Sequence, residues 1–336
     1  MESKANVLVT CGGKWVGTVL QLKQALREVP PLRHGRLYVA DQAAMTPAGQ
    51  FAEGSFVVPP ISHPGYIDAL WEVCRRERVR VLLPLIDIDQ VRLAPHKDRF
   101  AEAGTTLVSP PADLVEMLFD KTRFHRLAVA AGLPVPRRIT PEELDSADYP
   151  LFYKPIRGYG GIGAGRCDSP ADARRVCASR RDLIFQEFVS APELSIDCYI
   201  SPDGIPTVRV PRIRDKVLGG EVMQSHTVRP PEVNALAIRT LEVLARRGVH
   251  GPVTVQAFAT DEPLLLEVNP RLGSGNVLSN VATGGRLHRS VLAGACGLPV
   301  TGDPDDYRDG LYLYRYLGDV IHDGSAPFQV FPRVAA

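Results

Sequence analysis

The sequence predicts an α/β protein in two parts, a doubly wound parallel sheet followed by an α+β unit. Over residues 1–112, short β-branched runs alternate with amphipathic stretches, which is typical of the strands and helices of a parallel sheet. Beyond Pro150, strand-like runs dominate and only short helical stretches separate them, which favours an α+β architecture. The pattern changes near Pro110, so we expect the division at about residue 112.

The first part shows a regular succession of elements. Residues 7–10 are a β-branched run that meets Cys11-Gly12-Gly13, and an amphipathic stretch over residues 16–29 follows. This order predicts a strand, a tight turn and a helix. Residues 37–41 and 79–84 predict two further strands, with a helix over residues 66–76 between them.

The second part opens with a predicted helix over residues 114–131, after which Pro134 and Pro136 impose an extended exit. Strands are then expected at residues 151–154, 183–189, 194–200, 207–210, 253–259 and 264–269, and short helices at residues 170–177 and 231–247. Residues 328–336 are expected to form a tail.

Composition narrows the class of partner. Lysine and arginine total 39 against 38 acidic residues in a chain of 336, so no global field attracts nucleic acid or an anionic membrane. No apolar run approaches the roughly 20 residues of a spanning helix. The six cysteines are scattered, without a CxxC pair or a signal peptide. We therefore expect a cytoplasmic protein with a small-molecule partner.

A glycine-rich loop follows the strand predicted at residues 151–154. It includes Gly160, Gly161 and Gly163, and so much glycine allows backbone amides to converge on anionic oxygens. An isolated glycine cluster is more often a flexible hairpin loop. Lys154 directly before the loop changes this balance, because its ammonium could reach phosphates, and Lys121 adds a second cation.

A hairpin is predicted where residues 253–259 and 264–269 are separated by the turn-like residues 260–263. If those four residues are the loop, Ala259 faces Leu264 and Gln256 faces Glu267 at a Cβ separation of about 5 Å. Side chains alternate along a strand, so Glu267 and Asn269 share the face of Gln256. These three oxygen donors suit Mg²⁺. A solvated sheet face is the alternative interpretation.

Two residues beyond the hairpin, Arg271 offers a planar fork to a phosphate or carboxylate. The charged and polar residues singled out so far belong to an ordered set along the chain. In order, it consists of Asp120-Lys121, Tyr153-Lys154-Pro155, residues 186–189, Glu193, Gln256 and Glu267-Val268-Asn269-Pro270-Arg271. In these residues the chain resembles the ATP-grasp superfamily, in the branch of the carbamoyl-phosphate synthetase large subunit, biotin carboxylase and the amino-acid ligases.

The resemblance implies an ATP-grasp fold, with a Rossmann-like N-terminal domain over residues 1–112 and an ATP-grasp domain over residues 113–330. Within the latter it implies a lid at about 148–190 and an antiparallel catalytic subdomain at about 191–330. It also implies roles for individual residues. Lys121, Lys154 and the glycine loop would contact the phosphates of ATP, Gln186, Glu187, Phe188 and Val189 would hold the adenine, and Glu193 would accept the ribose hydroxyls. Gln256, Glu267 and Asn269 would bind Mg²⁺, for which Mn²⁺ could substitute, and Arg271 would stabilise the transferred phosphoryl group.

The resemblance further implies a carboxylate–amine ligase that forms an acyl phosphate and releases ADP and phosphate. Its partners would be a small-molecule carboxylate and an amine or another nucleophile, including a thiol, and a homodimer is compatible with the sequence. The Gly273-Ser274-Gly275 run resembles the amino-acid ligases, in which small residues leave room for a larger acyl group. Glu221 lies in a segment that the family turns toward substrate.

Arg212 and Arg214 are candidate clamps for a substrate carboxylate or the γ-phosphate, and a solvated basic strand is the equal alternative. Two rival functions keep the ATP-grasp fold, namely a kinase that stops at a phosphorylated product and an ATP-binding module without turnover. A dinucleotide-dependent oxidoreductase fits less well, because Lys14 occupies the place of the second glycine in its phosphate-binding turn.

Overall fold

The computed structural model describes residues 5–322 and 327–331. The N-terminal part is a five-stranded sheet in the order β3-β2-β1-β4-β5, and every neighbouring pair is parallel. Its strands are β1 (Asn6–Thr10), β2 (Leu37–Asp41), β3 (Gly54–Val57), β4 (Val79–Pro84) and β5 (Thr106–Leu107). Its α-helices are α1 (Val16–Glu28), α2 (Tyr66–Arg76), α3 (Asp87–Leu93) and α4 (Lys97–Glu102), and short 3₁₀ turns lie at η1 (Ala48–Gln50) and η2 (Ala94–His96).

Both faces of this sheet are covered. Val7 and Val9 pack into one hydrophobic cluster with α1 and α10 (Arg286–Ala295), whereas Leu8 packs into another with α2. The alternation of side chains along β1 therefore serves two cores, as a doubly wound sheet requires.

The helix predicted over residues 114–131 is divided into α5 (Ala112–Phe119) and α6 (Lys121–Ala130). Asp120 causes the break, because its carboxylate accepts hydrogen bonds from the backbone amides of Thr122 and Arg123 at 2.9 and 3.0 Å. This is an N-cap, which satisfies amides that have no partner within the helix. The break makes Lys121 the first residue of α6.

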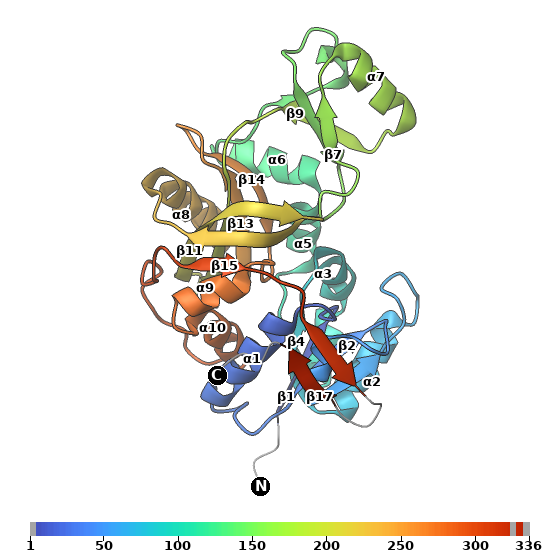
Figure 1. Cartoon of the computed structure of the whole chain (residues 1–336), viewed down its shortest axis with the longest axis vertical. Helices are drawn as coiled ribbons and strands as arrows, with labels where there is room; N and C mark the ends of the chain where they lie inside the picture. The colour runs from blue at the N-terminus through green and yellow to red at the C-terminus, as the bar shows by residue number, and fades with distance from the viewer. Residues whose placement is uncertain (1–4, 323–326, 332–336) are drawn as a thin grey trace.

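A small four-stranded antiparallel unit lies at one end of the molecule, and the N-terminal sheet lies at the other (Figure 1). Its strands follow the order β6-β9-β7-β8, and helix α7 (Pro170–Ser179) and the turn η3 (Pro141–Glu143) complete it. The strands are β6 (Arg138–Ile139), β7 (Leu151–Pro155), β8 (Gly165–Cys167) and β9 (Leu183–Glu187). The glycine loop connects β7 to β8, so it extends from this end unit.

Between these two units lies a six-stranded sheet in the order β14-β13-β10-β11-β12-β15 (Figure 1). Its strands are β10 (Glu193–Ile200), β11 (Pro206–Leu218), β12 (Glu221–Thr227), β13 (Gly251–Phe258), β14 (Leu264–Asn269) and β15 (Tyr312–Tyr314), and all are antiparallel to their neighbours. One face packs on α8 (Pro231–Ala245), α5 and α6. The predicted fold class is confirmed.

Several local predictions were incomplete. β11 continues eight residues beyond the predicted end at Val210, and neither β12 nor helices α9 (Asn276–Ala282) and α10 were predicted. Residues 328–331 belong to β17 (Pro327–Phe331), which pairs with β16 (Asp319–His322), so the predicted tail is wrong there, and residues 332–336 lie outside the described residues. Among the described residues, no helix combines the length and apolar character needed to cross a bilayer.

Candidate active site

The register of the β13–β14 hairpin brings the three predicted oxygen donors together. Gln256 pairs with Glu267, as predicted, and Thr254 pairs with Asn269. The Nδ2 of Asn269 donates a hydrogen bond to Glu267 Oε1 at 3.1 Å, which leaves its own carbonyl oxygen available. The predicted pairing of Ala259 with Leu264 is wrong, because a bulge after Gln256 absorbs one residue and Phe258 takes that place.

Lys154 is buried close to Glu267. Only 7% of the residue is exposed, and burial lowers the pKa of its ammonium to about 8, against the attraction of Glu267. Among the described residues this ammonium has charged neighbours but no hydrogen-bond partner. Burial disfavours the charged form of this amine, so an anionic group bound beside it would stabilise the ammonium.

The charge state of Glu267 follows from its neighbours. Burial alone would raise the pKa of its carboxyl group, but Lys154, Lys121, the Asn269 hydrogen bond and Arg271 together outweigh burial and hold the pKa below its usual range. Glu267 is therefore an anion in a site dominated by cations. The Nζ of Lys121 also donates a hydrogen bond to the carbonyl oxygen of Gly158 at 2.9 Å, which ties the glycine loop to α6.

The glycine loop reaches the turn between β11 and β12. Gly160, Gly161 and Gly163 have φ values of +65°, +71° and +76°, which L-residues with a side chain rarely adopt. The Cα of Gly160 contacts the position that a Cβ on Gly220 would take, so the two backbones meet where only glycine fits.

Arg271 does not offer a free fork. Its Nε and Nη2 donate to the two carboxylate oxygens of Asp87 at 2.9 and 2.6 Å, and its Nη1 donates to the carbonyl oxygen of Leu272. Asp87 begins α3, directly beyond β4 of the parallel sheet. Gln90, on the same helix, donates to the carbonyl oxygen of Pro270 at 2.7 Å. The N-terminal part thus fixes the arginine that follows the hairpin.

Arg214 and Glu193 form a second, largely buried ion pair on the same face. Arg214 Nε lies 3.0 Å from Glu193 Oε1, and 9% of the arginine side chain is exposed against 29% of the glutamate. Burial raises the pKa of the Glu193 carboxyl group, although Arg214 opposes this effect. Arg214 Nη1 also donates to Ser195 at 3.2 Å. The interpretation of Arg214 as a solvated basic residue is therefore wrong.

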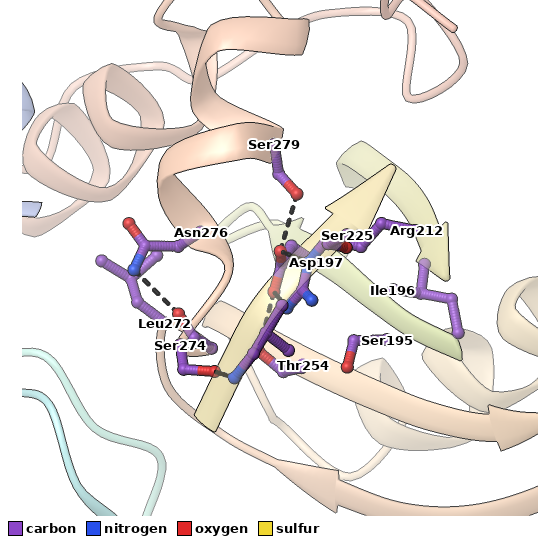
Figure 2. A network of polar contacts seen from close by, with 12 residues as sticks. Ser195, Ile196, Asp197, Arg212, Ser225, Thr254, Leu272, Ser274, Asn276 and Ser279 are labelled. Carbon is purple, nitrogen blue, oxygen red and sulfur yellow. Dashed lines mark hydrogen bonds and ion pairs between the residues drawn. The ribbon is translucent and has the colours of Figure 1, made fainter. Parts of the chain in front are cut away.

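Arg212 is buried too, and it faces the protein interior. Its Nε donates to Asp197 Oδ2 at 2.8 Å, and the same carboxylate accepts hydrogen bonds from Thr254 and Ser279 at 3.1 and 2.6 Å (Figure 2). No part of Arg212 is exposed. As a clamp for a substrate carboxylate or phosphate, Arg212 is a wrong prediction, because Asp197 already neutralises it away from solvent.

The same network explains Gly273 and Gly275. A Cβ on Gly273 would lie 2.7 Å from Asp197 Oδ1, and one on Gly275 would overlap the Arg212 guanidinium. The prediction that these residues are small to leave room for an acyl group is wrong in its reason, since the buried ion pair fills that space. Ser274 Oγ accepts a hydrogen bond from the Val222 amide at 3.3 Å, so it also contributes to packing in this loop (Figure 2).

Of the residues predicted for adenine, Gln186 and Glu187 are the last two of β9, and Phe188 and Val189 follow it. Gln186 is buried and donates to the carbonyl oxygen of Pro136 at 3.4 Å, and the Glu187 carboxylate accepts from the Arg137 amide at 2.7 Å. The ring of Phe188 lies 4.7 Å below the Arg166 guanidinium. The side chains of Gln186, Glu187 and Phe188 thus already have partners within the protein, which leaves their backbone groups as the candidates for contact with adenine.

Three charged residues near the site were not predicted as part of it. Asp87 holds Arg271, whereas Lys14 and Arg315 flank Glu221, at 2.5 and 3.8 Å from its carboxylate oxygens. Asp87 and Lys14 follow β4 and β1, the strands at which the order of the parallel sheet reverses, and ligands bind at that edge in open α/β sheets. This rule could have identified both, whereas Arg315 carries no local signal.

Two protein-family models match the chain. One, described as the PylC-like N-terminal domain, matches residues 7–108, and the other, described as the ATP-grasp domain, matches residues 119–275. The chain contains an ATP-grasp domain. The ATP-grasp match spans the glycine loop, the hairpin and Arg271, and the resemblance read from the sequence is confirmed.

Relatives of this ATP-grasp chain include the carbamoyl phosphate synthase large chain of Methanoculleus marisnigri, 25% identical over 216 residues that cover 58% of this chain and 20% of the relative. The D-alanine–D-alanine ligase of Corynebacterium jeikeium is 30% identical over 186 residues, covering 46% of this chain and 49% of the ligase. The chain thus spans at most about half the length of these two relatives.

Among solved structures, an L-amino acid ligase from Bacillus licheniformis superposes with a TM-score of 0.68 at 18% identity, over 88% of this chain and 75% of that chain. This likeness shows that the two chains share a fold. In residues 5–322 and 327–331, no group of three His, Cys, Asp or Glu side chains forms a metal site. A metal ion on this ATP-grasp face would therefore depend on the amide oxygens of Gln256 and Asn269 as well as on Glu267.

Proposed function

We propose that the protein is an ATP-dependent carboxylate–amine ligase that forms an acyl phosphate and releases ADP and phosphate. The observation that carries this proposal is the buried ammonium of Lys154, which has no hydrogen-bond partner among the described residues and lies near Glu267. A cation in this position meets the negative charge of a nucleotide phosphate, and the acidic residue beside it suits a divalent cation.

ATP would lie between the glycine loop and the six-stranded sheet. Lys154 and Lys121 would contact the phosphates, and the backbone amides of Gly160, Gly161 and Gly163 would approach them without obstruction from a Cβ. The segment from Gln186 to Val189 would bind the adenine through its backbone. Glu193 would accept hydrogen bonds from the ribose hydroxyls, with its carboxylate oriented by Arg214.

Mg²⁺ fits the donor set of Glu267, Gln256 and Asn269. One carboxylate and two amide oxygens leave most of an octahedron to phosphates and water, as Mg²⁺ prefers, and Mn²⁺ accepts the same ligands. The metal would supply charge neutralisation between ATP and the incoming carboxylate.

The reaction then has two steps. An oxygen of the substrate carboxylate attacks the γ-phosphorus, the bond to the β-phosphate oxygen breaks, and ADP leaves. The amine next attacks the acyl carbon, phosphate departs with the bonding electron pair, and the amine loses a proton. Lys154 and Lys121, which form no ion pair within 4 Å among the described residues, supply positive charge that lowers the repulsion between the two anions before the first step. Arg214 and Arg271, in contrast, are already paired with Glu193 and Asp87.

The comparisons favour this chemistry over its alternatives. The relatives named above include two ligases that act on amino acids and a carbamoyl phosphate synthase. Formation of a C–N bond is therefore the better proposal, and a thiol acceptor, which would give a C–S bond, is an outcome of the test. Because the chain covers only part of the two sequence relatives, the substrates must be found by experiment.

The test is a panel of carboxylates, each offered with ATP, Mg²⁺ and mixtures of amines and thiols, and scored for ADP and phosphate. Carboxylate-dependent ADP release with a coupled product would support the proposal. Release of AMP and pyrophosphate would mean adenylation instead, and a phosphorylated product that never couples would mean a kinase. ATP binding without turnover across the panel would favour a non-catalytic module.

A further inference from the structure

A cluster of three charged side chains, Lys14, Glu221 and Arg315, joins three distant segments of the chain. Lys14 lies in the turn after β1, Glu221 begins β12, and Arg315 directly follows β15. Lys14 Nζ lies 2.5 Å from Glu221 Oε1, and Arg315 Nη1 lies 3.8 Å from Glu221 Oε2. Two cations share one carboxylate, so the cluster carries a net positive charge.

Arg315 uses little of its hydrogen-bonding capacity. Its Nη2 donates to the carbonyl oxygen of Ser274, and 3.8 Å from Nη1 to Glu221 is too long for a hydrogen bond. Within residues 5–322 and 327–331, its Nε and Nη1 donate no hydrogen bond to another side chain or to the backbone. Each terminal nitrogen of a guanidinium carries two N–H groups, so Nη2 keeps one beside Nε or Nη1, and a quarter of the side chain is exposed. One edge of the guanidinium can therefore receive a planar anion.

Lys14 and Glu221 can separate when an anionic ligand binds. The Lys14 side chain is 69% exposed, so it can leave Glu221 without disturbing the packing, and the Glu221 side chain is 26% exposed. A surface ion pair of this kind contributes about 0–1 kcal/mol, so its loss is easily offset by a new contact. When no ligand is bound, the Glu221 carboxylate would partly neutralise the charges of Lys14 and Arg315.

The cluster lies on the same side of the six-stranded sheet as the proposed nucleotide site. Directly paired residues share a face, and the register connects Gln256 to Ser195, Ser195 to Arg212 and Arg212 to Thr227. Ser225, two residues before Thr227, and its partner Leu313 therefore lie on that face. Arg315 is two residues beyond Leu313, and its amide donates to the carbonyl oxygen of Met223, which continues the pairing on the same face. Ser274, which accepts the Arg315 hydrogen bond, is three residues beyond Arg271. Arg315 is thus connected through one loop to the arginine beside Glu267, and it lies outside both stretches matched by the family models.

We propose that Arg315, assisted by Lys14, binds a second carboxylate group, one that ATP does not activate, on either of the two substrates. The proposal rests on the proposed ligase function. A carboxylate fits better than a phosphate, because the net charge beside Glu221 is a single positive one and a guanidinium edge presents two parallel donors. Arg315 would then discriminate between substrates by an ionic contact remote from the reacting atoms.

The experiment uses the full chain and pairs of substrates that differ by one charge. Dicarboxylates from succinate to pimelate are compared with their monomethyl esters, and L-amino acids as acceptors with their amides, by ADP release. In at least one pair, we expect kcat/KM to favour the anionic member about 10- to 100-fold. Arg315→Gln should abolish that preference while the KM for ATP stays within about twofold, and Arg315→Lys should restore part of it.

Arg175→Gln is the matched control, since Arg175 lies on α7 at the far end of the molecule from β15 and is 76% exposed (Figure 1). It should leave the preference unchanged. Lys14→Gln, at an exposed position, keeps the test valid if Arg315→Gln fails to fold, and it should reduce the preference by a smaller factor. Equal rates for charged and neutral members, or a preference that survives both variants, would refute the carboxylate site. No ADP release from any pair would instead refute the ligase function itself.

Discussion

Asp197→Asn is a sharp test of the buried ion pair between Asp197 and Arg212, against which the loop with Gly273 and Gly275 packs. The substitution keeps the shape of the side chain but removes the charge that neutralises Arg212, of which no part is exposed, while Asp197 is 2% exposed. It also replaces an acceptor of hydrogen bonds from Arg212, Thr254 and Ser279 with an amide that is half donor. Leaving one buried charge unpaired costs about 3–5 kcal/mol.

This cost can be measured by urea titration and by thermal unfolding. An unfolding entropy of about 2.1 cal/mol/K per residue over the whole chain converts the loss to a decrease in Tm of about 4–7 °C. Asp145→Asn is the control, because Asp145 pairs with Arg174 on the surface, where their side chains are 72% and 60% exposed, and should lose less than about 1 kcal/mol. If the two variants lose equal stability, the buried pair does not have the structural role assigned to it.

Three further predictions concern catalysis. Glu267→Gln should lower turnover at least about 100-fold, roughly 2.7 kcal/mol of transition-state stabilisation, with little change in the Tm without ligand, and a variant that unfolds early yet turns over normally would contradict the metal assignment. Because the pKa of Lys154 is lowered to about 8, its ammonium loses its proton as pH rises through 8. Calorimetry should therefore find ATP bound about 10-fold more weakly at pH 9 than at pH 7, and Lys154→Arg should remove this pH dependence. A wild-type affinity for ATP that stays constant from pH 7 to pH 9 would count against the role of Lys154. Asp87→Asn should lower kcat about 10-fold through misplacement of Arg271 while the Kd for ATP changes less than about twofold, and an unchanged kcat would show that Arg271 needs no such support.

Local signals in the sequence were sufficient for the central hairpin. The turn residues 260–263 and the alternation along both strands gave the pairing of Gln256 with Glu267, and Asn269 followed from the period of two. The bulge that shifts Phe258 opposite Leu264 was missed, because no residue type in a buried apolar strand marks where an extra residue is absorbed. The break before Lys121 had a readable signal in the capping side chain of Asp120.

Contacts between distant segments could not be predicted in this way. Asp87 and Arg271 are 184 positions apart, and Asp197 and Ser279 are 82 apart, so only the assembled fold brings them together. Gly275 was correctly noted as small, but its neighbour could be identified only once Arg212 was placed. Sequence patterns of short range predict elements and registers, whereas the partner of a charged side chain depends on packing between elements.

The pairing of Asp87 with Arg271 bears on the exchange of modules between related proteins. Recombination that joined this ATP-binding portion to a foreign N-terminal half would separate the two members of that pair, since each half encodes one of them. The hybrid would keep every residue of the proposed phosphate and metal site and still lose the support for its arginine. An active hybrid should need either a crossover point that retains α3 or a foreign half with a carboxylate at the position of Asp87. Recombination between related proteins must therefore preserve the pairing of Asp87 with Arg271.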